Sequence, residues 1–192
     1  MAFEKLDPAD DQLLESFRRG DQAGLTAIIR QWQEPLFRMA FRILGDVSSA
    51  EDVRQTVFLR LLESPDKLPQ TERFGSWIRR CVINEAFLQL RKRETHRRAV
   101  QKMASQAALS AFEGDFSGDL SAAEECACLT AALSRLDPGK RVLLTLRFDE
   151  GLTFQEIATI LERPTSTVKS QVSGAIVELR ELIGMPQRRE TK

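Results

Sequence analysis

Apolar residues recur at helical spacing along most of the chain, and this pattern predicts an all-α fold. They follow one another every three or four positions, as on one face of an α-helix, and no pair of segments alternates as paired strands would. Pro35 falls inside one apolar run and is expected to kink or restart that helix. Ser48 or Ser49 is the expected cap of the next helix, which places Glu51 and Asp52 in its first turn, where acids favour the helix dipole. Helices are predicted over residues 13–20, 25–44, 48–62 and 74–98, with a proline-containing loop at 64–73.

The apolar stripes also predict which side chains are buried. In the helix over 48–62 the expected buried residues are Val53, Val57, Phe58, Leu61 and Leu62. In the helix over 74–98 they are Trp77, Ile78, Cys81, Val82 and Leu88.

A helix-turn-helix is predicted between Gly151 and Ile176. Thr153 and Glu156 have the spacing of a capping box at the start of one short helix. After a brief turn a second helix is expected to begin at Thr165 or Ser166, both of which are good N-cap residues. In this arrangement the second helix can enter a DNA major groove. Its polar face combines short donors and acceptors with one cation, which suits base edges and phosphates: Thr167, Lys169, Ser170, Gln171 and Ser173. The alternative is an ordinary helical hairpin whose polar face meets water.

A second candidate nucleic-acid face lies on the helix over 74–98. Arg80, Asn84, Phe87 and Arg91 are spaced as one stripe of a helix. Asparagine can pair with adenine, arginine can hold phosphates or guanine, and an aromatic ring can stack on an unpaired base. The alternative is that Phe87 belongs to the core and the arginines form a solvated face.

Composition narrows the class of protein. Hydrophobic residues make up 42% and charged residues 29%, as in soluble proteins, and no apolar run is long enough to cross a membrane. The N-terminus shows no secretory signal, and three cysteines suit a reducing cytoplasm better than a disulfide framework. Cys126 and Cys128 with the distant His96 do not predict a metal site, and no nucleophile–base set predicts an enzyme. The net charge of zero argues against a protein that coats nucleic acid through bulk charge.

Charge is nevertheless sorted along the chain, and this divides it into parts. Residues 73–98 are strongly basic, whereas residues 103–134 contain acids but no Lys or Arg. The segment around 104–128 is rich in Ala, Ser, Gly and acids, a composition that buries little. Asp137 before Pro138 is a cap residue followed by a proline at the first position of the next helix. We therefore expect two small helical domains, at 10–98 and 129–185, joined by a flexible acidic linker at 99–128.

The order of these parts resembles that of a bacterial sigma factor of the extracytoplasmic-function (ECF) group. The resemblance covers roughly Asp10 to Ile183 apart from the linker. In the N-terminal part the matching residues are Ala50-Glu51-Asp52-Val53-Arg54-Gln55-Thr56-Val57-Phe58, Arg73-Phe74-Gly75-Ser76-Trp77-Ile78, Asn84 and Arg91-Lys92-Arg93. In the C-terminal part they are Leu133, Leu136, Arg147, Glu156-Ile157-Ala158 and Thr167-Val168-Lys169-Ser170.

The resemblance implies partners and roles for particular residues. The expected partners are core RNA polymerase, promoter DNA and an anti-sigma factor, for a monomeric cytoplasmic chain that needs no cofactor. It is not expected to be an enzyme, because the polymerase core performs the chemistry. The loop at 64–73 occupies the place where the family captures a flipped base. The residues implied to bind polymerase are Glu51, Asp52, Gln55 and Phe58; those implied to meet the minus-ten element are Arg80, Asn84, Arg91, Lys92 and Arg93; and those implied to meet the minus-thirty-five element are Thr167, Lys169, Ser170 and Gln171.

Several positions depart from the family pattern. Thr56 stands where an acid is usual, and the loop at 64–73 lacks an aromatic residue. Glu162 stands where glycine is usual; a left-handed backbone there would cost glutamate about 1 kcal/mol, so a slightly different turn is expected. Arginines are usual at the positions of Gln171 and Gly174, so fewer phosphate contacts and weaker promoter binding are expected. Gln171 could read adenine instead.

Two other functions are compatible with the sequence. One is a sigma-like interaction protein that binds polymerase or an anti-sigma factor but hardly binds DNA. The other is a plain helix-turn-helix regulator that dimerises on palindromic DNA. In the free chain the two domains are also expected to be able to close on each other, because the net charge of zero allows mutual masking.

Overall fold

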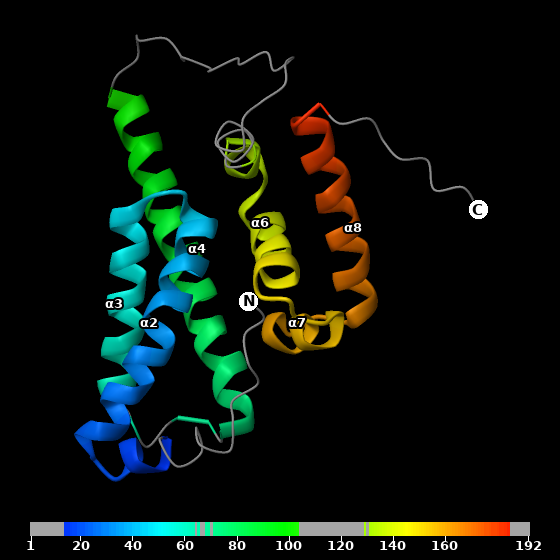
Figure 1. Cartoon of the computed structure of the whole chain (residues 1–192). Coiled ribbons are helices and arrows are strands. Elements are labelled where there is room, and N and C mark those ends of the chain that lie inside the picture. Colours follow the sequence, from blue (N-terminus) through cyan, green and yellow to red (C-terminus); the bar gives the residue numbers. More distant parts are fainter. Residues whose placement is uncertain are drawn as a thin grey trace, which may run out of the picture.

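A computed structural model describes residues 14–63, 65, 68–69, 71–103, 129 and 131–184, with the side chains at 71–72 and 97–103 outside the description. The described residues form helices and no strand. After a short helical turn at 14–18 come α2 (Gln22–Leu44), α3 (Val47–Glu63) and α4 (Thr71–Met103). The C-terminal unit contains α6 (Pro138–Leu144), the π-helical turn η2 (Thr145–Asp149), α7 (Phe154–Leu161) and α8 (Thr165–Leu182). Helices α2, α3 and α4 form one bundle, and the C-terminal unit lies along α4 (Figure 1).

Helix α2 is continuous through Pro35 and does not restart there. The carboxylate of Asp21 caps it by accepting a hydrogen bond from the backbone N–H of Ala23, which satisfies one orphan donor of the first turn. Gly45 ends the helix in the left-handed conformation, with φ of 71°, which glycine adopts without a Cβ penalty. The tight turn that follows leads directly into α3.

The predicted cap of α3 at Ser48 or Ser49 is wrong, because the helix begins earlier, at Val47. The capping carboxylate is that of Asp46, which accepts a hydrogen bond from the Ser49 backbone N–H at 3.0 Å. Glu51 and Asp52 therefore lie beyond the first turn, where the helix dipole has little effect. Their placement near the helix start does not explain why acids occupy these positions.

Helix α4 is longer than the periodicity predicted. It begins at Thr71, within the predicted loop at 64–73, and continues past Arg98 to Met103. The rest of the predicted linker, at 104–128, lies outside the described residues. Leu88, predicted on the buried stripe, is 41% exposed, whereas Ile83 and Ala86 are buried. The stripe differs because α4 packs against helices of both units, so that more than one of its faces is covered.

The C-terminal unit starts and turns largely as predicted. Asp137 caps α6 by accepting from the Gly139 N–H at 2.8 Å, with Pro138 at the first helical position. The capping box of Thr153 and Glu156 is confirmed at the start of α7. Helix α8 begins at Thr165, as predicted, but Thr165 is not its cap, because the cap position is Pro164, which has no side-chain cap bond.

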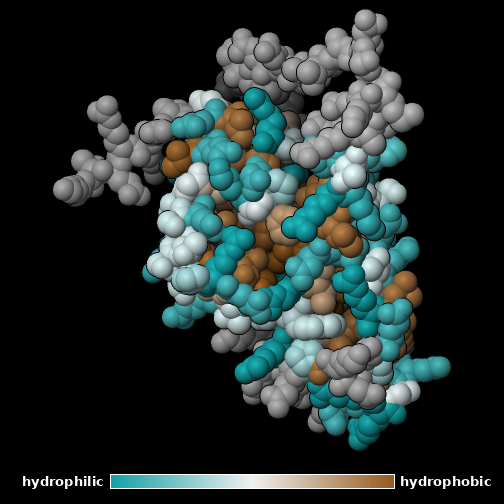
Figure 2. Space-filling model, turned by 180° about the vertical axis from the view of Figure 1, so that it is seen from behind, coloured by the Kyte–Doolittle hydropathy of each residue, from teal (hydrophilic) through white to brown (hydrophobic). Residues whose placement is uncertain are grey.

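The two units share one hydrophobic core. Helix α7 packs against α4, and α6 and η2 pack against α2, so the closure expected from the sequence is present in the structure. The exterior is largely polar: Figure 2 shows hydrophilic side chains surrounding a smaller apolar hollow on one face. The shared core includes, from the N-terminal unit, Leu36, Ile43, Val57, Phe74, Ile78 and Val82, and from the C-terminal unit, Val142, Leu146, Ile157, Val168 and Val172.

Candidate nucleic-acid interface

The predicted polymerase-binding residues of α3 divide into two exposed and two half-buried side chains. Asp52 and Gln55 are exposed. Glu51 forms an ion pair with Arg54, and Phe58 packs against the core. The structure therefore presents two of these four side chains fully to a partner.

Two leucines extend this surface of α3. Leu59 is 57% exposed and Leu62 is 47% exposed, although Leu62 was predicted to be buried. The spacing of Asp52, Gln55, Leu59 and Leu62 places them on one side of the helix. We name these four residues the α3 stripe. Its leucines were missed because an apolar residue next to a buried stripe gives no sign of exposure in the sequence.

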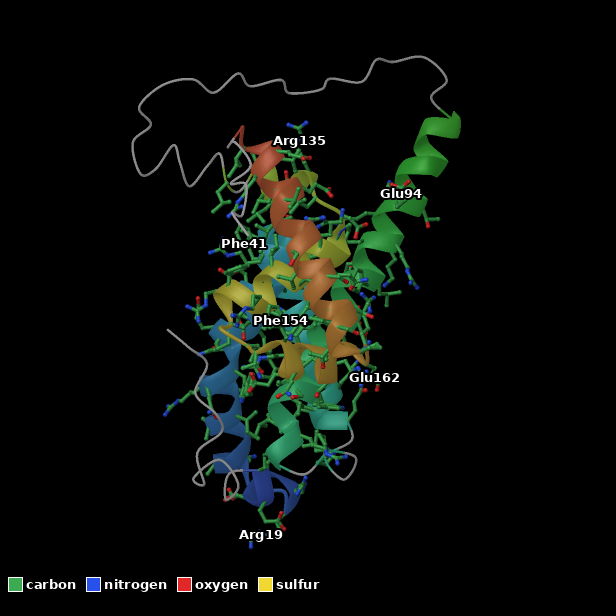
Figure 3. The ribbon with its side chains drawn as sticks, turned by 90° about the vertical axis from the view of Figure 1, so that its right-hand side faces the viewer. Arg19, Phe41, Glu94, Arg135, Phe154 and Glu162 are labelled. Atoms are coloured by element: carbon green, nitrogen blue, oxygen red, sulfur yellow. The ribbon has the colours of Figure 1, made fainter. Side chains whose placement is uncertain are left out.

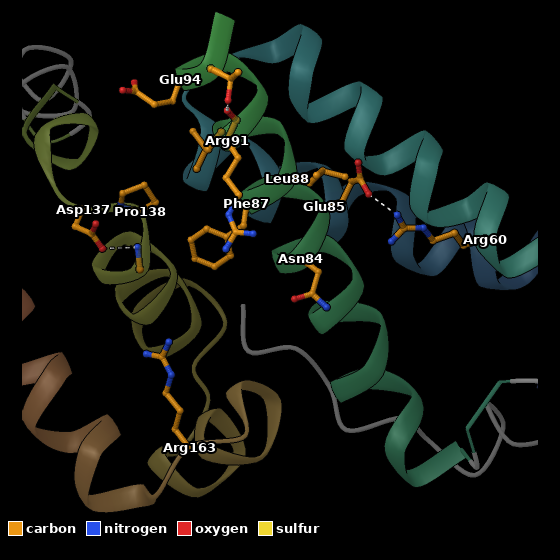
Figure 4. A pocket seen from close by; sticks show the side chains of 13 residues that line it. Arg60, Asn84, Glu85, Phe87, Leu88, Arg91, Glu94, Asp137, Pro138 and Arg163 are labelled. Carbon is orange, nitrogen blue, oxygen red and sulfur yellow. Dashed lines mark hydrogen bonds and ion pairs between the residues drawn. The ribbon is translucent and has the colours of Figure 1, made fainter. Parts of the chain in front are cut away.

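The stripe predicted on α4 faces the C-terminal unit. Asn84, Phe87 and Arg91 line a cleft of about 1150 Å³, opposite Pro138 and Arg163 (Figure 4). Asn84 and Arg91 are exposed within it, whereas Phe87 is half-buried and packs against the shared core. Phe87 thus lies both at the edge of the core and on the wall of the cleft. Both interpretations of this residue are compatible with its position.

We name Arg80, Asn84, Phe87 and Arg91 the α4 stripe. Its first residue, Arg80, forms an ion pair with the turn of the helix-turn-helix. Its guanidinium lies 2.5 Å from the carboxylate of Glu162, and its side chain is 32% exposed. In this arrangement the guanidinium of Arg80 is engaged by a carboxylate of the other unit.

The run Arg91-Lys92-Arg93 does not form one cationic surface. Arg91 and Lys92 are exposed, but Arg93 donates to the backbone oxygen of Leu44 and to the side chains of Asp46 and Ser49. Arg93 thus holds the turn between α2 and α3 from the side of α4. This role was not visible in the sequence, because the partners lie far from Arg93 along the chain.

On the recognition helix α8, the predicted DNA-binding residues are partly engaged. Lys169 and Ser170 are exposed. Lys169 lies over the ring of Phe154, 5.9 Å from its centroid, and the Ser170 hydroxyl donates to the backbone oxygen of half-buried Thr167 at 2.9 Å. Short polar groups and one cation thus meet solvent on this helix, as the sequence predicted.

Arg163 adds a cation that sequence reasoning missed. Its guanidinium donates to the side-chain oxygen of Gln171 at 3.0 Å. Because arginine only donates, the Gln171 oxygen faces Arg163 and the Gln171 NH₂ group is left to donate elsewhere. The only sign in the sequence was an arginine in the turn before the recognition helix.

The turn itself keeps the left-handed conformation that glycine would adopt. Glu162 has φ of 51° and ψ of 46°, so the expectation of a different turn is wrong. Its backbone N–H caps α7 through the carbonyls of Ala158 and Thr159. Phe154 and Glu162 flank this short helix at its two ends (Figure 3). The capping geometry maintains the turn despite a cost of about 1 kcal/mol for the side chain.

A buried ion pair joins the two units. The Nε of Arg79 on α4 donates to Glu150 at 3.1 Å, and its Nη1 donates to the backbone oxygen of Gly75 at 2.9 Å. The guanidinium carbon lies 5.2 Å from the ring centroid of Trp32. Burial raises the pKa of the Glu150 carboxyl to about 7, although Arg79 acts in the opposite direction. Neither residue was predicted as part of a site.

A helical bundle joined to a helix-turn-helix, with short polar side chains on the second helix, is an arrangement typical of DNA-binding proteins. Residues 28–96 match the family described as Sigma-70 region 2, and residues 132–181 match Sigma-70, region 4. The RNA polymerase sigma-H factor of Pseudomonas aeruginosa is 28% identical over 171 residues, which cover 85% of this chain and 88% of that protein. The ECF RNA polymerase sigma factor SigW of Bacillus subtilis is 23% identical over 174 residues, which cover 88% and 93%. The chain belongs to the ECF group of bacterial sigma factors, which direct RNA polymerase to promoters.

Two solved structures share the fold. CnrH, in complex with the cytosolic domain of CnrY, has a TM-score of 0.65 and 20% identity, covering 92% of this chain and 97% of that one. RpoE of Bartonella quintana, in complex with the anti-sigma factor NepR, has a TM-score of 0.64 and 23% identity, covering 84% and 98%. At these identities the likeness supports the fold.

No described helix is both long enough and apolar enough to cross a membrane. Within the same part of the chain, no group of three or more His, Cys, Asp or Glu side chains is placed to hold a metal ion.

Proposed function

We propose that this sigma factor uses three separate surfaces: the α3 stripe for core RNA polymerase, the α4 stripe for the minus-ten element and α8 for the minus-thirty-five element. The observation that supports this assignment most is that each family match covers the helices that carry the corresponding surfaces. The region 2 match contains α3 and most of α4, and the region 4 match contains the helix-turn-helix. We assign these roles to units at 10–98 and 129–185, joined by the segment at 99–128.

The α3 stripe fits a partner with a basic and apolar helical surface. Asp52 supplies a negative charge, Gln55 a hydrogen-bonding group, and Leu59 and Leu62 exposed apolar area. Complementary charge speeds and orients the encounter, whereas burial of the leucines supplies affinity. Glu51 and Phe58 support this surface from its inner edge.

The minus-ten element requires the α4 stripe to be uncovered. In the structure Arg80 is paired with Glu162, and the cleft containing Asn84, Phe87 and Arg91 faces α6. A melted strand therefore needs the two units to separate before it can reach these side chains along their full length. Arg91 and Lys92 then supply phosphate contacts, while Phe87 supplies a ring on which a base can stack.

The minus-thirty-five element is read by α8 with help from the preceding turn. Lys169 and Arg163 supply the charge, and Ser170, Thr167 and Gln171 the short donors and acceptors. Two weak contacts joined by one chain reinforce each other through effective concentration. Promoter binding thus depends on both units acting together on the polymerase.

We further propose that the free chain is monomeric, has no catalytic activity of its own and is regulated by an anti-sigma factor. The structurally similar RpoE of Bartonella quintana is bound to the anti-sigma factor NepR in its solved structure. The cleft between α4 and α6 offers apolar and charged groups from both units to such a partner.

A second candidate function is a sigma-like protein that binds polymerase but hardly binds DNA. It is favoured by Gln171 and Gly174, which stand where the family usually has arginine. Its recognition helix would then be too weakly charged to select a promoter.

Transcription from a library of random upstream sequences, with purified chain and core bacterial RNA polymerase, tests both candidates. We expect enriched start sites that share two spaced elements. Asp52→Lys should abolish this selection by blocking polymerase binding, whereas the matched charge reversal Glu34→Lys, at an exposed position on α2, should not. Polymerase binding without promoter selection would favour the second candidate, and no polymerase binding would contradict both.

A further inference from the structure

The turn of the helix-turn-helix fixes the backbone of Arg163. Its N–H donates to the carbonyl oxygen of Ala158 at 3.0 Å, and the left-handed Glu162 before it completes a Schellman arrangement at the end of α7. Pro164 follows, and a proline keeps the residue before it out of the helical conformation. The exposed side chain of Arg163 therefore starts from a position that is held on both sides.

Gln171 lies on an element whose rotation is also fixed. Its neighbours Val168 and Val172 are buried in the shared core, which sets the face that α8 turns outward. Gln171 is half-buried, and its side-chain oxygen accepts a hydrogen bond from the Arg163 guanidinium at 3.0 Å. Both ends of this hydrogen bond are in place before DNA arrives, so less side-chain entropy is lost on binding.

The contact changes what Gln171 can offer to a base. An isolated glutamine pairs with adenine because its amide presents an acceptor and a donor together. Here the Gln171 oxygen already accepts from Arg163, and a second donor, from adenine, would lie against the positive charge of the guanidinium. The Gln171 NH₂ group and the remaining N–H groups of Arg163 are all donors. The contact therefore removes the feature that suits glutamine to adenine.

We propose that Arg163 and Gln171 act as one donor-only unit that selects a guanine in the minus-thirty-five element. This inference rests on the proposed role of α8 at that element. Guanine presents two acceptors, N7 and O6, on its major-groove edge, whereas adenine presents N7 beside its N6 donor. The Gln171 NH₂ group and a second N–H of Arg163 match the two acceptors of guanine. A residue of the turn thus sets base specificity together with a residue of α8.

Base preference separates this role from a simple contribution of charge. A phosphate contact positions the protein on DNA but carries no direct sequence information. If Arg163 contacted only phosphate, its loss would weaken binding to all sequences about equally. In the donor-only unit, loss of Arg163 instead changes which base is preferred at one position.

The test measures base preference with the complete holoenzyme. Core bacterial RNA polymerase with each full-length variant transcribes a promoter library randomised over the upstream region, and sequencing gives the preference at every position. Gln171→Ala identifies the position that Gln171 reads, because the preference there should be lost. At that position wild type should favour guanine over adenine by about tenfold. Arg163→Ala should shift the preference to adenine, because the Gln171 oxygen is then available to the adenine N6 donor.

Two further variants serve as controls. Arg163→Lys should keep the preference for guanine, because lysine also only donates. Arg135→Ala removes an exposed arginine of the same unit, far from the turn at Glu162 (Figure 3), and should change no preference. The preference at the downstream element should be the same in all variants. Helical content and binding to core polymerase report whether each variant is folded.

The outcomes distinguish the donor-only unit from the proposed function of α8. A shift from guanine to adenine in Arg163→Ala, with guanine kept in Arg163→Lys, supports the unit. A wild type that favours adenine at the Gln171 position, or a guanine preference that survives Arg163→Ala, overturns the unit and leaves the role of α8 standing. So does an upstream element that Gln171→Ala does not alter. If wild type selects no upstream element at all, the role of α8 is overturned and the base preference with it.

Discussion

The guanidinium of Arg163 holds the side-chain oxygen of Gln171, 3.0 Å away, across the turn of the helix-turn-helix. This contact places a positive charge from the turn beside the recognition helix. It also fixes the orientation of the Gln171 amide, because the arginine can only donate and the Gln171 oxygen must therefore face it.

Arg163→Ala should therefore weaken binding to the upstream promoter element. With one phosphate contact fewer, the slope of log K against log salt concentration should fall by about one. Binding of duplex DNA containing the element enriched in the transcription library, measured across salt concentrations, tests this. Arg30→Ala, at an exposed position on α2, is the control and should leave the slope unchanged. A slope unaffected by Arg163→Ala would remove Arg163 from the interface.

The left-handed residue in the same turn offers a stability test. Glu162→Gly should raise the free energy of unfolding by about 1 kcal/mol or somewhat less, because glycine adopts φ of 51° without strain. Urea denaturation followed by circular dichroism measures the change. Glu162→Ala is the matched control: it loses the same ion pair with Arg80 but keeps the strain, so it should not stabilise the chain. Equal effects of the two substitutions would show that the backbone strain is negligible.

Gly174 in the middle of α8 is a second position where stability can be gained. A Cβ there meets no atom within 4 Å, so Gly174→Ala should stabilise the chain by about 1 kcal/mol through helix propensity. Gly45→Ala is the control, since its φ of 71° makes the same substitution unfavourable. Thermal unfolding should shift upward for Gly174→Ala and downward for Gly45→Ala. A downward shift for both would show that a Cβ at position 174 is not accommodated in the folded chain and would contradict the propensity argument.

Closure should also depend on pH. Burial raises the pKa of Glu150 from 4.5 to about 7, while Arg79 and Arg38 lower it and Asp149 raises it further. The closed state therefore binds the Glu150 proton more tightly than an open state with an ordinary carboxyl. Closure should be most favourable below about pH 4.5, weaken as pH rises to about 7, and stay constant above that.

The radius of gyration, followed from pH 5 to pH 8.5, checks this pH dependence. Glu150→Gln cannot ionise, so its radius should not change in this window. A wild-type radius that decreased with rising pH would contradict the sign of the effect.

The local parts of the fold could be predicted from the sequence. The capping box at Thr153 and Glu156 and the cap at Asp137 depend on neighbouring residues, and both are present in the structure. The predicted start of α3 was wrong because Asp46 and Ser48 are both good cap residues. Hydrophobic periodicity cannot choose between candidates only two positions apart.

The contact between the units could not be predicted from any local pattern. Arg79 and Glu150 are 71 positions apart, and neither stands in a motif that predicts a contact between them. Arg93 was assigned to a DNA-binding run because its neighbours are basic. Its partners in the structure are Asp46, just before α3, and Ser49, in the first turn of α3. Helical spacing identifies a face of a helix, but the element that packs on that face depends on the tertiary fold.

The low charge of the exposed helix α8 has a consequence for how the free chain meets chromosomal DNA. Random DNA attracts proteins mainly through phosphate contacts, and it offers an enormous excess of sites. On α8, Lys169 meets solvent between uncharged serine and glutamine side chains, and the net charge of the whole chain is zero. With Lys169 and Arg163 supplying the charge at this surface, we expect the free factor to bind arbitrary sequence weakly, so that the chromosome retains little of it and the unbound pool stays available to polymerase.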